Sequence, residues 1–152
     1  MRFFKHLSLL IVTLSLMNLI ISCGEKKAET QSTGEELVQE EAAPDYSAGE
    51  KIYNAKCAAC HMANGEGIQG AFPPLAKSDY LLADKKRAVK QVLNGSHEEM
   101  VVNGITYNAE MPPQVETYQE AVDVINYVLN AWGNDEGSIT VDEVKDIEIV
   151  RK

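Results

Sequence analysis

Two cysteines and a histidine stand within five consecutive residues, Cys57-Ala58-Ala59-Cys60-His61. Cysteines three positions apart lie on the same side of a helical turn, so both thiols can bond to the two vinyl groups of one haem. The imidazole of His61 follows directly and can then reach the haem iron from one face. The pentapeptide therefore predicts one covalently attached haem c, with His61 as an iron ligand.

Two other kinds of site use cysteines at this spacing. A thioredoxin-like redox pair follows a strand in an alternating βα pattern, and the sequence has no such alternation. A structural zinc site needs four ligands. Beyond Cys57, Cys60 and His61, the only other histidine after residue 22 is His97, and no second cysteine pair is present. Haem attachment is the stronger prediction.

A first helix is expected to carry the motif. Ser47, with Glu50 three residues later, has the pattern of a capping box and predicts the start of this helix. Residues then recur every four positions along one stripe, namely Gly49, Tyr53, Cys57 and His61. The loop that follows is rich in glycine and proline.

Two elements are predicted in the middle of the chain. Asp84 can start a helix, and Gly95 can end it because glycine readily takes the left-handed backbone conformation. One face of this helix is apolar and comprises Ala88, Val89, Val92 and Leu93. Asn103-Gly104 is a strong turn signal and predicts a tight hairpin over residues 101–106.

Two capping boxes predict helices near the C-terminus. Thr117 with Glu120 opens a last long helix that is closed by Gly133. Its expected core face comprises Ala121, Val124, Ile125, Val128 and Leu129. Thr140 with Glu143 predicts one more short helix within a charged tail.

From about Tyr46 to Trp132 the sequence resembles class I cytochromes c, the small all-helical electron carriers. The resemblance rests on Gly49-xxx-Tyr53-xxx-Cys57-xx-Cys60-His61, on Pro73-Pro74-Leu75, on Met111-Pro112, and on the pair Val124 and Tyr127. It implies an all-α fold, the class I cytochrome c fold, with helices wrapped around one covalently attached haem. In such a fold Gly49 would allow the first and last helices to cross near Tyr127.

The resemblance also implies the surroundings of the iron. Met111 would be the sixth ligand. The carbonyl of Pro73 would accept a hydrogen bond from the ring N–H of His61, and Leu75 would pack on the haem face. Trp132 is expected to cover the core and not to contact the cofactor.

Met62, Met100 and His97 are competitors for the sixth position. Met62 is the neighbour of His61 and cannot readily reach the opposite haem face. Met100 enters an apolar stretch and is expected in the core, while His97 stands in a polar, surface-like setting. We therefore favour Met111.

The first residues are typical of an export signal. Arg2 and Lys5 precede an apolar run that is shorter than the roughly 20 residues of a membrane-spanning helix. The run ends at Ile20-Ile21-Ser22-Cys23-Gly24, which resembles the lipobox of bacterial lipoproteins, in which the cysteine is acylated. An ordinary cleaved signal with an incidental Cys23 is the alternative.

These features predict four segments. Residues 1–22 form a lipoprotein signal peptide, and residues 23–44 a lipid-anchored, flexible acidic tether with hardly any large apolar residue. Residues 45–133 form the cytochrome c domain, and residues 134–152 a charged C-terminal tail. The protein is expected to be exported, anchored to the bacterial membrane by lipid, and periplasm-facing.

The charge limits the possible partners. The chain has 14 basic and 23 acidic residues, a formal net charge of −9, and it lacks the basic clusters that bind nucleic acid. We expect a monomer that carries single electrons and is not an enzyme. Its partners would be membrane-bound redox proteins, such as a quinol-oxidising complex, a terminal oxidase or a reductase. A haem enzyme subunit or a gas sensor with an open axial site is the alternative.

Overall fold

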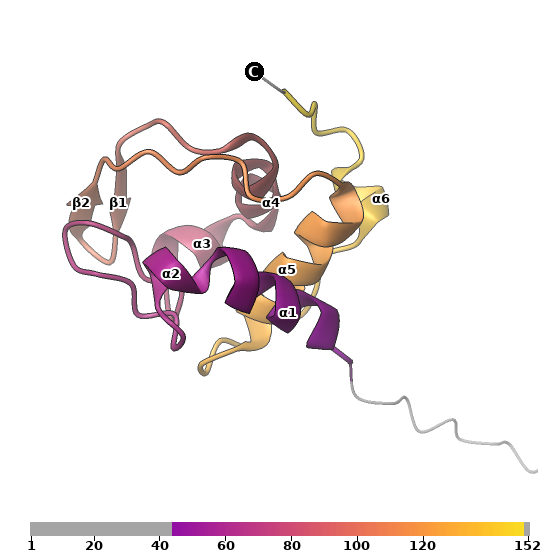
Figure 1. Cartoon of the computed structure of the whole chain (residues 1–152), viewed down its shortest axis with the longest axis horizontal. Coiled ribbons are helices and arrows are strands. Elements are labelled where there is room, and N and C mark those ends of the chain that lie inside the picture. Colours follow the sequence, from indigo (N-terminus) through magenta and orange to yellow (C-terminus); the bar gives the residue numbers. More distant parts are fainter. Residues whose placement is uncertain (1–43, 151–152) are drawn as a thin grey trace, which may run out of the picture. The chain divides into compact units, whose positions relative to one another are not determined.

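A computed structural model describes residues 44–150. These residues are mostly helical, as the sequence predicted, and Figure 1 shows the helices and a two-stranded hairpin. The elements are α1 (Ser47–Lys56), α2 (Ala58–His61), α3 (Asp79–Ala83), α4 (Lys85–Asn94), β1 (Met100–Val102), β2 (Ile105–Tyr107), α5 (Tyr118–Asn130) and α6 (Val141–Val144). None of the helices in these residues combines the length and the hydrophobicity of a membrane span. The expected signal peptide and Cys23 lie outside the described residues.

Helices α1 and α5 cross and contact each other (Figure 1), and Gly49 lies at their contact. A Cβ atom on Gly49 would lie 2.0 Å from the carbonyl oxygen of Asp123 and 2.7 Å from the Cβ of Tyr127. Only a residue without a side chain allows this approach, so the predicted packing role of Gly49 is confirmed. Beside the crossing, the ring of Tyr53 packs on Tyr127 and Trp132 with centroid distances of 5.5 and 4.8 Å.

The last long helix has the predicted start and core face. The Thr117 side chain accepts a hydrogen bond from the Glu120 amide, and the Glu120 carboxylate accepts one from the Thr117 amide. The five residues predicted for the core face are all buried. The helix ends at Asn130, earlier than the predicted stop, and the chain reverses where Trp132 and Gly133 have positive φ angles of 52° and 84°.

The predicted helix and hairpin in the middle of the chain are confirmed. The Asp84 side chain caps α4 by accepting a hydrogen bond from the Arg87 amide. Gly95, with a φ of 83°, follows the last residue of the helix. The strands pair antiparallel with Val102 opposite Ile105, and positive φ angles at Asn103 and Gly104 form the turn.

The predicted capping box at Ser47 is wrong. The N-cap of α1 is Tyr46, without a side-chain hydrogen bond, and the carboxylate of Asp45 accepts from the Ser47 amide at 2.9 Å. A second difference is α3, which the sequence analysis did not predict. It begins at Asp79, and the hydroxyl of its N-cap residue Ser78 accepts a hydrogen bond from the Leu81 amide.

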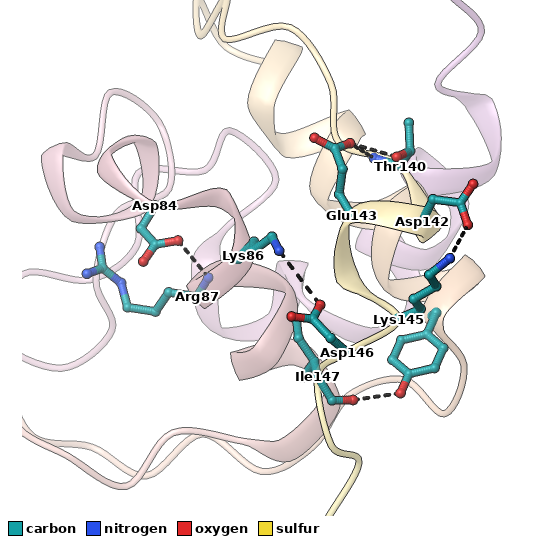
Figure 2. A network of polar contacts seen from close by, with 10 residues as sticks. Asp84, Lys86, Arg87, Thr140, Asp142, Glu143, Lys145, Asp146 and Ile147 are labelled. Atoms are coloured by element: carbon teal, nitrogen blue, oxygen red, sulfur yellow. Dashed lines mark hydrogen bonds and ion pairs between the residues drawn. The ribbon is translucent and has the colours of Figure 1, made fainter.

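Residues 134–150 pack against α4 and α5. Val144 in α6 is fully buried, and the Tyr118 hydroxyl donates to the Ile147 carbonyl at 2.6 Å. Figure 2 shows the ion pair of Lys86 with Asp146 and the predicted capping box at the start of α6. The compact unit therefore continues to the end of the described chain, past residue 133.

Candidate haem site

One cavity brings together every side chain predicted to surround a haem. Its lining includes the six predicted residues Cys57, Cys60, His61, Pro73, Leu75 and Met111. They come from three separate parts of the chain: the junction of α1 and α2, the loop before α3, and the segment between β2 and α5. Helices α4 and α5 add apolar side chains to the lining, among them Val92, Ile125 and Val128.

The two thiols lie on one helical turn. The backbone amides of Cys60 and His61 both donate to the Cys57 carbonyl, at 3.1 and 2.9 Å. Cys57 is buried and Cys60 is exposed, and burial raises the pKa of the Cys57 thiol to about 11. Redox-active cysteine pairs depend on a lowered thiol pKa. The raised pKa of Cys57 therefore does not favour a redox-active pair.

The ring of His61 is held by the loop that follows it. Its Nδ1 lies 2.9 Å from the Pro73 carbonyl oxygen. Because a carbonyl can only accept, Nδ1 carries the proton and Nε2 keeps its lone pair free for a metal. Burial lowers the pKa of His61, although the bond to Pro73 partly opposes this. The imidazole is therefore neutral and ready to act as a ligand.

Backbone hydrogen bonds close the loop that carries Pro73 and Leu75. The Gly65 carbonyl accepts from the Leu75 amide at 2.7 Å, and the Gly67 amide donates to the His61 carbonyl at 3.0 Å. Gly67 has a φ of 64°, and a Cβ there would lie 2.4 Å from the Phe72 carbonyl oxygen. Glycine at position 67 thus allows the turn that brings Pro73 to His61.

Met111 is fixed through its main chain. Its amide donates to the Ser96 carbonyl and its carbonyl accepts from the Ser96 amide, at 2.9 and 2.8 Å. Gly95 makes this pairing possible, because a Cβ there would lie 2.5 Å from the Met111 carbonyl oxygen. The end of α4 therefore positions the segment that presents the thioether to the cavity.

The competitors for the sixth position differ in their placement. Met62 and His97 lie outside the cavity lining. The Met62 carbonyl accepts a hydrogen bond from the Tyr53 hydroxyl. His97 is exposed and lies beside Glu110. Met100 lines the cavity as several core residues do, but it is only half-buried and is not part of the buried core, so its prediction as a core residue is wrong. In the hairpin register Met100 pairs with Tyr107, which lines the same cavity.

Polar residues that the sequence analysis did not single out also line the cavity, namely Tyr80, Gln91 and Ser96. The Gln91 amide donates to the Ser96 hydroxyl at 3.2 Å. No local motif marks these residues. Trp132, in contrast, packs with the aromatic rings outside the lining, as predicted.

The donor set fits haem c. The same largely apolar cavity is lined by the thiols of Cys57 and Cys60, by the His61 imidazole with its free Nε2, and by the Met111 thioether. A covalently bound macrocycle needs these groups together, and the thioether is a soft ligand suited to haem iron.

Comparisons with known proteins agree with this site. The profile of the cytochrome c family matches residues 46–132. Two cytochromes c-552 of Thermus thermophilus are each 38% identical over 91 residues, which make up 57% of this chain and 69% and 61% of the two relatives. The cytochrome c subunit of a quinone alcohol dehydrogenase from Gluconobacter oxydans is 28% identical over 102 residues, 65% of this chain and 21% of that subunit.

This chain belongs to the cytochrome c family. It has the class I cytochrome c fold, and its cofactor is haem c bound covalently through Cys57 and Cys60. It is an electron carrier of this family.

Proposed function

We propose that this protein is a monomeric mono-haem cytochrome that carries single electrons between membrane-bound respiratory donors and acceptors, with the iron held by His61 and Met111. The observation that carries the proposal is that both side chains line the cavity that holds the two cysteines. Haem c supplies an iron that cycles between the ferrous and ferric states.

The chain's own residues suit a carrier and not an enzyme. With His61 and Met111 both holding the iron, no ligand position would remain for a substrate or for oxygen. A thioether ligand favours the reduced iron and raises the redox potential. Apolar side chains of α4 and α5 line the site, and such a lining around a bound haem would favour transfer of an electron with little rearrangement.

Membrane attachment through Cys23 is part of the proposal. Acyl chains on Cys23 would anchor the protein on the periplasmic face, and the acidic segment up to residue 44 would connect the anchor to the domain. The resemblance of Ile20-Ile21-Ser22-Cys23-Gly24 to a lipobox supports this. Cys23→Ser should move the holoprotein from the membrane fraction to the soluble fraction. Retention of the variant in the membrane fraction would count against the anchor.

The partners are membrane-bound redox proteins such as a quinol-oxidising complex, a terminal oxidase or a reductase. Similarity to the cytochrome c subunit of a quinone alcohol dehydrogenase supports a place in quinone-linked electron transfer. The acidic chain, with its formal net charge of −9, suits a partner with a basic docking surface.

Carbon monoxide separates the carrier from a haem enzyme subunit or a gas sensor. The reduced wild-type protein should not bind carbon monoxide stoichiometrically at neutral pH, because the Met111 thioether closes the sixth position. Met111→Ala should bind it readily and serves as the positive control. Rapid, stoichiometric binding by the wild type would favour an enzyme or sensor with an open axial site.

A further inference from the structure

Asn134 is a buried polar residue just beyond the part of the chain that matches the cytochrome c family. Its side chain is only 6% exposed and makes three hydrogen bonds to backbone groups. The amide nitrogen donates to the carbonyls of Val128 and Leu75, at 2.7 and 3.1 Å, and the amide oxygen accepts from the Lys77 amide at 2.8 Å.

These bonds join the end of α5 to the loop that holds the proximal histidine. Leu75 lines the cavity, and the Pro73 carbonyl that accepts from His61 is two residues earlier. Lys77 has a φ of 52°, a left-handed conformation that is unfavourable for a lysine. Asn134 stabilises this conformation through the Lys77 amide, and it holds the chain on either side of Ala76.

We propose that Asn134 is a positioning residue for the proximal side of the haem. It holds the Leu75–Lys77 segment in place, so that the Pro73 carbonyl keeps its bond to His61 and Leu75 keeps its place on the cavity wall. The inference rests on the proposed ligation of iron by His61. A hydrogen bond to the outer nitrogen of a ligating histidine raises the basicity of the ligand. Loosening this bond should therefore favour the ferrous iron and raise the redox potential.

Asn126 provides a matched control. Its side chain also makes two backbone hydrogen bonds, donating to the Ile139 carbonyl at 3.0 Å and accepting from the Ile139 amide at 2.8 Å. It thus ties the chain after α5 to the helix, as Asn134 does, but these bonds do not reach the loop of Pro73. Asn134→Ala and Asn126→Ala should both lower stability, so stability alone does not distinguish a structural role from a positioning role.

The test compares the wild-type, Asn134→Ala and Asn126→Ala holoproteins. Two readouts are the exchange rate of the His61 ring N–H in the reduced protein, measured by NMR, and the midpoint potential. Asn134→Ala should accelerate exchange at least tenfold and shift the potential upward, whereas Asn126→Ala should leave both near their wild-type values. Unchanged readouts in Asn134→Ala, or equal changes in the two variants, would overturn the inference.

A second variant covers the case in which Asn134→Ala does not mature. Asn134→Asp keeps the acceptor for the Lys77 amide and loses both donated bonds, and it should accelerate exchange of the His61 ring N–H in the same way. Only the exchange rate is compared in this variant, because a buried carboxylate lowers the potential by its own charge, and a wild-type exchange rate would also overturn the inference. If the wild-type spectrum lacks a histidine-ligated iron, the proposed function fails instead, and this outcome is visible before any variant is compared.

Discussion

Nδ1 of His61 lies 2.9 Å from the carbonyl oxygen of Pro73. This hydrogen bond connects the helical turn that carries both thiols to the loop that follows it. It fixes the ring's tautomer and orientation together, because the donor must be the protonated nitrogen. The geometry of the loop therefore decides how His61 faces the cavity.

Gly67 is where this loop is most sensitive to substitution. A Cβ there would lie 2.4 Å from the Phe72 carbonyl oxygen and 2.6 Å from that of Pro73. Gly67→Ala should lower the free energy of unfolding by about 2–4 kcal/mol, because a steric clash is added to an unfavourable positive φ. It should also shift the redox potential, because the Pro73 carbonyl must move.

Gly70→Ala is the control for Gly67→Ala. Gly70 has a similar φ of 77°, but a Cβ there would meet nothing within 4 Å. This variant should lower the free energy of unfolding by only roughly 1–2 kcal/mol, because alanine is less favourable than glycine at a positive φ. Its redox potential should equal that of the wild type. Denaturant unfolding and a redox titration measure both quantities. Equal effects of the two substitutions would show that the close approach to Pro73 has no consequence.

The packing of α6 is tested by Val144→Ala. Val144 is fully buried, so the truncation should leave a cavity and lower the free energy of unfolding by about 1–3 kcal/mol. The redox potential should stay unchanged, because Val144 is not part of the haem cavity lining. Val150→Ala, at a side chain that is 48% exposed, should change stability by less than about 0.5 kcal/mol. Equal stability of both variants would mean that residues 134–150 do not contribute to the folded domain.

The capping box of α5 gives the stability a pH dependence. A hydrogen bond from the Glu116 amide, joined by bonds from Thr117, holds the pKa of Glu120 below its ordinary value. A carboxyl with a lowered pKa stabilises the fold above its unfolded pKa, and this contribution is lost as the pH falls through the folded pKa. Because the Glu120 carboxyl is still open to solvent, the contribution is less than about 1 kcal/mol.

Glu120→Gln should therefore be slightly less stable than wild type at pH 7, and the difference should disappear as the pH falls below the ordinary glutamate pKa of about 4.3. Denaturant unfolding at a series of pH values measures this. Glu98→Gln makes the same change in charge at an exposed position outside the capping box and controls for net charge. A difference between wild type and Glu120→Gln that grows in acid would contradict the assignment.

Without haem the domain should lose its cooperative fold. Side chains such as Leu75, Val92, Ile125 and Val128 line the cavity. Burial of one such side chain contributes about 1.5–3 kcal/mol, and a whole domain is stable by only about 5–15 kcal/mol. The double variant Cys57→Ala/Cys60→Ala, which cannot attach haem, should show a weak helical signal in circular dichroism and no sharp melting transition. A native-like, cooperative melt would refute this.

Local chemistry explains why several elements were predictable. The Asn103-Gly104 turn and the cap at Asp84 each depend on residues next to one another in the sequence, and both formed as predicted. Ser47 has the same capping pattern as Thr117, yet its box did not form, because Asp45 supplies the acceptor to the Ser47 amide. A local pattern does not reveal which of two nearby acceptors prevails.

Long-range contacts explain what the sequence did not reveal. Asn134 binds the backbone of Leu75 and Lys77, which are more than fifty residues earlier, and no spacing rule connects them. Met100 was expected in the core, but it is only half-buried, although it lies with the buried Val102 on the cavity side of the hairpin. The period of two in that strand indicates the shared face but not how deeply each side chain is buried.

A redox titration followed by optical spectra, on wild type, Met111→Ala and Met100→Ala, tests the iron ligands most directly. If His61 and Met111 hold the iron, Met111→Ala should lower the midpoint potential by on the order of 0.1 V, within the roughly 0.8 V range set by axial ligands, and should change the spectrum. Met100→Ala should keep the wild-type potential and spectrum. A wild-type potential in Met111→Ala together with a lowered one in Met100→Ala would contradict the ligation by Met111.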